Sequence, residues 1–144
     1  MKNLSISAAA KYKINKKNIH SLVKNLSLEL NFILETLDIN IVDSKTLLQV
    51  NIEFLGHNYD TDIITFNYSD NIDILNGELL ISYDMAEENA KRFNCSLNSE
   101  IIRLVIHGIL HMTGYDDMNP EDRKKMKRKE NYFVKLFENL VVIN

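Results

Sequence analysis

The sequence predicts an α/β fold of the α+β kind, in which a small mixed β-sheet is packed with helices around a buried central helix that carries HxxxH. Segments with helical spacing alternate with short β-branched runs, which is typical of helices packed on a sheet. Two strand-like runs around residues 62–82 are joined by a turn-rich connection, as in a hairpin. The segment after Ser99 is apolar on almost every side, so a helix there must be buried all round.

Length and composition indicate one domain. The chain has 144 residues, of which 45% are hydrophobic, and this is the usual size of a domain and enough for a core. One proline and four glycines leave little room for a flexible linker. We therefore expect residues 1–144 to form a single domain.

The N-terminal part predicts strand, helix and strand in that order. Residues 3–8 (NLSISA) alternate weakly and suggest a first strand. Residues 18–37 show helical spacing, which predicts one long helix with a single buried stripe. The stripe consists of Ile19, Leu22, Val23, Leu26, Leu30, Ile33, Leu34 and Leu37. The β-branched run 39–42 predicts a short strand.

The middle of the chain predicts a helix and the hairpin-like pair. Asp43 or Ser44 can cap a helix that runs to about residue 54, before Gly56. Residues 62–68 (DIITFNY) favour a strand because they are β-branched and aromatic. Residues 69–77 are expected to form the connection, and ELLIS at 78–82 the next strand.

The C-terminal half predicts three helices. The first covers residues 83–93, and the second begins at Asn98 or Ser99 and ends before Gly114. Apolar side chains surround this second helix at Ile101, Ile102, Leu104, Val105, Ile106, Ile109, Leu110 and Met112. Asn119-Pro120 opens the last helix with a cap and a proline at its first position.

The stretch HGILHMTGYDD is the strongest candidate for a metal site, because His107 and His111 are spaced i and i+4. On a helix this spacing places both imidazoles on one face, about 5–6 Å apart at Cβ, so both can reach one metal ion. Gly114 allows a sharp turn that brings Asp116 and Asp117 within a short loop of them. The alternative is a pair of core histidines, each of which would need a buried hydrogen-bond partner.

Other features of the sequence disfavour several classes of protein. Gly108 stands where zinc proteases of the HExxH type carry their glutamate base, so a metallopeptidase is a weaker alternative. Cys95 is the only cysteine, which excludes an internal disulfide and a cysteine-rich zinc site and fits a reducing compartment. Neither a membrane span nor the apolar core of a signal peptide is visible, so we expect a cytoplasmic protein without a membrane partner.

HGILHMTGYDD resembles HGxLHLxGYDH, the signature of the YbeY endoribonuclease family. NIEFLGHNYDTDIITF resembles the family's LNxxYRGKDxPTDVLSF, and NGELLIS resembles its LGDIVIS. The resemblance covers about residues 40–135 with the motifs in the family's order, and by these motifs the chain is identified as a member. It implies a small sheet with surrounding helices and one zinc ion in a cleft.

The resemblance also implies the activity and the ligands. The expected protein is a zinc-dependent, single-strand-specific endoribonuclease of 16S rRNA 3′-end maturation and ribosome quality control. Its partners would be single-stranded RNA or rRNA and the ribosome or ribosomal proteins, without DNA. The family's three zinc-ligating histidines fall on His107, His111 and Asp117, so an aspartate is the expected third metal ligand. Such a site also accepts other divalent transition metals. Asp116 is the alternative third ligand, but its place in the signature leads us to expect that it supports the turn or the ligands.

The chain departs from the family at the expected cleft. Leu55 stands in place of an arginine suited to phosphate, and His57 in place of a lysine. Glu78 replaces an aspartate and is the candidate, by motif, for proton transfer, while the pattern itself fixes no catalytic residue. Loss of the arginine supports another alternative, a non-catalytic ribosome-assembly factor with a structural metal.

The net charge of −3 means that RNA binding would depend on a local basic patch. One basic cluster spans residues 123–129, and a second consists of Lys11, Lys13, Lys16 and Lys17. A solvated helix face is the simpler interpretation of the first cluster. If both clusters faced one groove, however, they could follow an RNA backbone.

Overall fold

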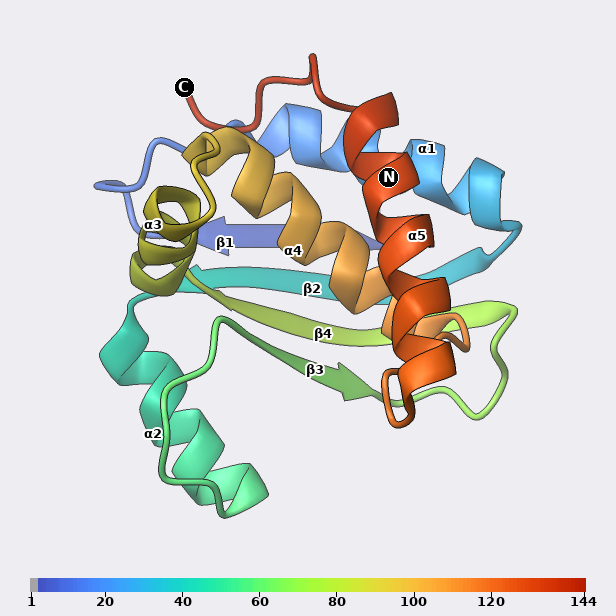
Figure 1. Cartoon of the computed structure of the whole chain (residues 1–144), viewed down its shortest axis with the longest axis horizontal. Helices are drawn as coiled ribbons and strands as arrows, with labels where there is room; N and C mark the ends of the chain where they lie inside the picture. The colour runs from blue at the N-terminus through green and yellow to red at the C-terminus, as the bar shows by residue number, and fades with distance from the viewer. Residues whose placement is uncertain (1–2) are drawn as a thin grey trace.

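The computed structural model describes residues 3–144, in which strands and helices mix and the last three elements are helices, as predicted (Figure 1). The elements are β1 (Leu4–Ala8), α1 (Lys16–Leu30), β2 (Ile33–Val42), α2 (Ser44–Leu55), β3 (Ile63–Asn67), β4 (Ile74–Ser82), α3 (Tyr83–Arg92), α4 (Leu97–Met112) and α5 (Pro120–Leu136). Within this described part, no helix is both long and apolar enough to cross a bilayer.

The four strands form one mixed sheet in the order β1-β2-β4-β3. β1, β2 and β4 run parallel, and β3 pairs antiparallel with β4. Helix α1 connects β1 to β2, as parallel neighbours require a crossover. The mixed sheet and the antiparallel pair around residues 62–82 confirm the predicted fold class.

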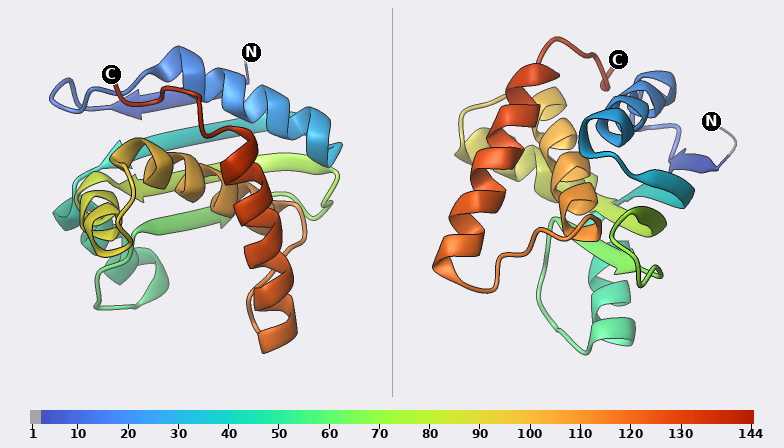
Figure 2. Two further views of the ribbon diagram at one scale, coloured as in Figure 1. Left: turned by 45° about the horizontal axis from the view of Figure 1, so that its top comes forward. Right: turned by 90° about the vertical axis from the view of Figure 1, so that its right-hand side faces the viewer.

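The two faces of the sheet are covered unequally (Figure 2). Leu37, Ile39 and Ile41 of β2 point into the main core, which they share with buried side chains of α1, α4 and α5. On the opposite face, Leu47 of α2 packs with Ile64 of β3 in a smaller cluster. The alternation of β2 and β4 side chains between these clusters follows from the two-residue period of a strand.

Helix α4 is the central element, as predicted, and ten of its sixteen residues are buried. Ser96 caps its N-terminus by accepting a hydrogen bond from the Ser99 backbone. Between Glu100 and Met112, only Arg103, His107 and His111 are partly exposed. These three residues are four apart and therefore form one polar line along an otherwise buried helix.

The predicted helix over residues 18–37 is too long. Helix α1 ends at Leu30, and Asn31 takes a left-handed conformation with φ of 57° that turns the chain into β2. Asparagine is one of the few residues that adopt this conformation readily. Ile33, Leu34 and Leu37 fit the helical spacing by coincidence. They belong to β2, in which buried residues alternate with more exposed ones from Leu37 onward.

Strand β4 begins at Ile74, inside the segment predicted as a connection. The added part contains Leu75, which is 1% exposed, and Gly77, which packs against β3 and α4. Residues 74–77 nevertheless form a strand because they pair with β2, and Gly77 also pairs with Asn67 of β3. Strand β2 likewise extends well before the predicted run 39–42.

Gly77 is required for the close approach of these elements. A Cβ at this position would meet the backbone carbonyl of Phe66 and would lie 2.7 Å from Met112 Cε. We expect Gly77→Ala to lower the free energy of unfolding by about 1–3 kcal/mol, because the carbonyl cannot move without breaking the β3–β4 pairing. Urea denaturation measures this, with the exposed Ser7→Ala as the control. Equal stability of both variants would contradict the packing described here.

Candidate metal centre

The two histidines and Asp117 come together at the end of α4. The potential ligand atoms of His107, His111 and Asp117 lie within 4.8 Å of one another. The two imidazole rings are 4.7 Å apart between centroids, and His111 Nε2 lies 3.8 Å from Asp117 Oδ2. Two imidazoles and one carboxylate form a donor set that divalent transition metals accept, so these residues fit such an ion.

The loop after α4 positions the carboxylate. Gly114 has φ of +102°, a conformation that favours glycine, and the Tyr115 backbone N–H then donates to Leu110 O at 3.0 Å. Arg123 of α5 donates to the backbone carbonyl of Asp117 at 3.3 Å. The turn predicted from Gly114 therefore returns the chain to the histidines, and α5 holds it there.

Asp116 has a different contact from Asp117. Its Oδ1 atom accepts a hydrogen bond from the Met118 backbone N–H at 3.2 Å, which stabilises the turn. Asp116 is not among the residues whose ligand atoms converge. The two neighbouring acids are thus separated by geometry, with Asp117 at the histidines and Asp116 within the loop.

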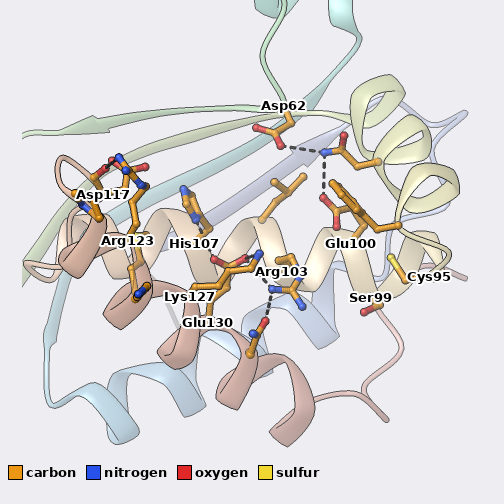
Figure 3. Close-up of a pocket in the computed structure, with 17 residues that line it drawn as sticks. Asp62, Cys95, Ser99, Glu100, Arg103, His107, Asp117, Arg123, Lys127 and Glu130 are labelled. Carbon is orange, nitrogen blue, oxygen red and sulfur yellow. Dashed lines mark hydrogen bonds and ion pairs between the residues drawn. The ribbon is translucent and has the colours of Figure 1, made fainter.

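A buried carboxylate lies behind His107. Glu130 of α5 is only 5% exposed, and its Oε2 atom is 3.3 Å from His107 Nδ1 (Figure 3). Its Oε1 atom accepts a hydrogen bond from Arg103 Nη1 at 2.9 Å. If His107 Nδ1–H donates to Glu130, the Nε2 lone pair of His107 is left free for a metal.

The pKa values of Glu130 and His111 are both lowered, which favours metal binding. Burial alone would raise the pKa of Glu130, but hydrogen bonds from His107 and Arg103 outweigh it and lower that pKa, so the carboxylate stays charged. Burial, and then the neighbouring His107, lower the pKa of His111. The neutral imidazole that results is the form that binds a metal.

Two cavities meet at this site. The larger cavity, of about 790 Å³, lies beside α4 and α5 and is lined by His107, Asp117 and Glu130 together with Arg103, Arg123, Lys124 and Lys127. The smaller cavity, of about 500 Å³, lies beside β3 and the loop after α2. His107 and Asp62 line both cavities, so a substrate could extend from the metal centre in two directions.

The residues expected at the cleft fall in different places. Leu55 and His57 line the smaller cavity together with both histidines, so the family's arginine position does lie at the site. Glu78 does not. It is paired in register with Phe66 and accepts a hydrogen bond from Asn40 at 2.8 Å, whereas the preceding Gly77 faces α4. Glu78 therefore points away from the histidines, and its proposed part in proton transfer is wrong.

The two basic clusters do not share a groove. Arg123, Lys124 and Lys127 line the larger cavity, so part of the 123–129 run is more than a solvated helix face. Lys129 instead lies over the Phe133 ring, 5.3 Å from its centroid. The cluster at residues 11–17 lines neither of the two cavities.

Arg103 and Glu130 were not predicted as site residues, although the sequence carries a signal for each. Arg103 precedes His107 by four residues and so shares its helix face. Met126, Glu130 and Phe133 follow one helical stripe, and all three are buried. An acid on an apolar stripe needs a partner, and this requirement singles out Glu130 in a helix otherwise rich in exposed charge.

Comparison with known proteins identifies the family. The family model described as Endoribonuclease YbeY matches residues 2–138. This chain belongs to that family. The match extends the resemblance beyond residues 40–135 to almost the whole chain. The chain departs from the HGxLHLxGYDH signature at Met112, which stands in place of a leucine, and at Asp117, which stands in place of the last histidine.

Individual proteins agree with this membership. Endoribonuclease YbeY of Bacteroides thetaiotaomicron is 36% identical over 118 residues, which cover 82% of this chain and 85% of the relative. The YbeY proteins of Chlorobium phaeovibrioides and Chlorobium limicola are 41% and 47% identical, and the chain spans 62% of the length of each. The solution structure of TM1509 from Thermotoga maritima matches with a TM-score of 0.67 at 26% identity, covering 94% of this chain and 90% of TM1509.

The contact between Glu130 and His107 generates a prediction about metal affinity. We expect Glu130→Ala to weaken zinc binding by about 10–100-fold, because the imidazole loses the group that orients it. Competition with a chromophoric chelator measures the affinity, and circular dichroism checks that the variant is folded. Glu121→Ala removes an exposed acid from the same helix and should leave the affinity unchanged. A folded Glu130→Ala protein with unaltered affinity would refute the role given to Glu130.

Proposed function

We propose that this chain is a zinc-dependent endoribonuclease that cleaves single-stranded RNA in 16S rRNA 3′-end maturation and ribosome quality control. The convergence of His107, His111 and Asp117 where two cavities meet is the observation that carries the proposal. Relatives named Endoribonuclease YbeY support the choice of RNA as substrate. Residues 1–144 would act as one domain, in the cytoplasm and in contact with the ribosome or its proteins.

The three residues would hold one divalent metal, with zinc as the first candidate. Imidazole nitrogen and carboxylate oxygen both suit zinc, while iron, manganese and nickel accept the same donors. The bound metal would supply Lewis-acid chemistry, polarising a phosphoryl oxygen and making water more acidic. The aspartate in place of a third histidine makes the site more negative by about one charge. The bound metal would therefore polarise the phosphoryl oxygen and acidify water less strongly.

The side chains around the metal centre would position the RNA. Arg103, Arg123 and Lys127 line the larger cavity and offer positive charge to phosphate oxygens. Arg103 is held by its hydrogen bond to Glu130, so its guanidinium is placed before the substrate arrives. Such preorganised charge orients a phosphodiester without a further cost of ordering the side chain.

The exposure of the site argues against a structural metal in an assembly factor, and the residue at position 108 argues against a metallopeptidase. The side chains of His107, His111 and Asp117 are 27%, 29% and 49% exposed, and they open to both cavities. A purely structural metal in an assembly factor would favour a closed shell, so this openness supports catalysis. A metallopeptidase of the HExxH type needs a base at position 108, where Gly108 is buried against Leu79.

The proposal predicts that His111→Ala loses both metal and activity. The purified protein should contain about one zinc per chain, measured by mass spectrometry, and should cleave labelled single-stranded RNA but neither duplex RNA nor DNA. We expect His111→Ala to lose stoichiometric zinc and at least about a hundredfold in kcat/KM, since catalysis depends on the metal. His20→Ala, on α1, is the control. A His111→Ala protein with full zinc content would overturn the metal site, and zinc without RNA turnover would support an assembly factor.

A further inference from the structure

The smaller cavity differs chemically from the larger one. Among residues 3–144, four cationic and four acidic side chains line the larger cavity, whereas no lysine or arginine lines the smaller one. The smaller cavity instead brings together Leu55, His57 and Tyr59 with the metal-site histidines. Leu55 and His57 occupy the positions where the family resemblance places an arginine and a lysine. The charge expected there has therefore been replaced by apolar and aromatic surface.

His57 and Tyr59 form a stacked pair. Their ring centroids are 5.2 Å apart with an interplanar angle of 16°, and Tyr59 Oη lies 3.1 Å from His57 Nδ1. Tyr59 is nevertheless 58% exposed, so its ring is available to a ligand. A large exposed ring held in one orientation loses little conformational freedom when it binds.

The loop that carries this pair is anchored to α2. Asn51 is 2% exposed, and its side-chain amide donates to the Tyr59 backbone carbonyl at 2.9 Å. The His57 backbone N–H donates to Asn51 O at 3.1 Å. Gly56 takes φ of +68° and ends α2, which sends the chain into this loop. One buried residue thus holds the loop at His57 and at Tyr59, and its two contacts involve backbone groups of these aromatic residues, not their rings.

We propose that the smaller cavity is a base-stacking subsite, in which a nucleobase of single-stranded RNA packs on Tyr59 and His57 beside the metal histidines. The inference rests on the proposed function and names how its substrate is held. An aromatic platform in a cavity whose described lining contains no lysine or arginine suits a base, because every base presents a π-face to an exposed ring. The cationic side chains of the larger cavity then hold the phosphates on the other side of His107.

The subsite explains how the chain holds RNA without the arginine expected at position 55. A stacked base contributes affinity that does not depend on neutralising a phosphate. An apolar Leu55 is favourable beside a base and would be unfavourable beside a phosphate oxygen. The cavity also excludes duplex RNA, since a paired base is not free to stack on Tyr59.

The test combines substitutions in the protein with abasic positions in the RNA, and it uses the metal-loaded enzyme. A single abasic nucleotide is moved along a single-stranded RNA relative to the cleavage site, and kcat/KM is measured for each position. With the unaltered protein, we expect one position next to the cleavage site at which loss of the base lowers kcat/KM by about tenfold or more. With Tyr59→Ala, the intact RNA should be cleaved more slowly, and loss of that same base should have little further effect.

Two further variants sharpen the result. Tyr59→Phe keeps the ring and should keep the dependence on that base. Tyr68→Ala removes an aromatic side chain that is also exposed but does not line the smaller cavity, so it should behave as the unaltered protein. Tyr59→Ala should also leave the salt dependence of kcat/KM unchanged, because stacking releases no counterions.

The outcomes separate this inference from the proposed function. RNA cleavage with no base-dependent position, or with equal dependence in Tyr59→Ala, would overturn the stacking subsite and leave the ribonuclease standing. Absence of RNA cleavage by the unaltered, metal-loaded protein would overturn both. A preference for apolar peptides over RNA in binding competition would assign the cavity to a protein partner and would also contradict the subsite.

Discussion

The pairing of one buried carboxylate organises the candidate site. Glu130 lies between α4 and α5, and a charge buried there is unfavourable unless it is paired. Arg103 and His107 satisfy its two oxygens from the neighbouring helix. The same contacts fix the His107 ring, hold the Arg103 guanidinium at the larger cavity and keep α5 beside the loop that carries Asp117.

The position of α5 connects this pairing to the rest of the site. Arg123 lies two turns before Glu130 on the same helix and donates to the Asp117 backbone. The helix therefore contributes to the metal centre through its contact with His107, through the loop and through its cationic side chains. A mostly buried α4 supplies a rigid support, because its apolar sides leave it little freedom to move.

The departures from the family signature agree with one another. An aspartate replaces the third histidine, and leucine and histidine replace two cationic residues at the smaller cavity. The arginine and lysine side chains of the two linings consequently lie in the larger cavity, where four carboxylates accompany them, and aromatic surface lies in the smaller cavity. Such an arrangement would suit single-stranded RNA whose phosphates contact the larger cavity and whose bases contact the smaller one.

Much of the fold could be predicted because its signals are local. The caps at Asp43 and Asn119 are where the sequence placed them, and the apolar α4 is buried as its composition required. The boundary between α1 and β2 was missed because Ile33 and Leu34 fit both a helix and a strand, and only the backbone at Asn31 separates the two.

The candidate site was predictable along α4 and less so across elements. The i and i+4 spacing of the histidines and the Gly114 turn predicted that Asp116 and Asp117 lie near them, and the family resemblance selected Asp117, whose ligand atoms do converge with theirs. The apolar stripe of α5 marks Glu130 as an acid that needs a partner, but it does not show that the partners are Arg103 and His107 of another helix. Glu78 was misplaced because a motif match does not show which face of the sheet a side chain occupies.

X-ray absorption at the zinc edge tests whether His107, His111 and Asp117 are the metal ligands, because it counts the imidazoles bound to the metal. For the zinc-loaded protein we expect two imidazole nitrogens and at least one oxygen at about 2.0–2.1 Å. Asp117→His should raise the imidazole count to three without changing the number of bound ions. The same imidazole count in both proteins would contradict the assignment of Asp117 as the third ligand beside His107 and His111.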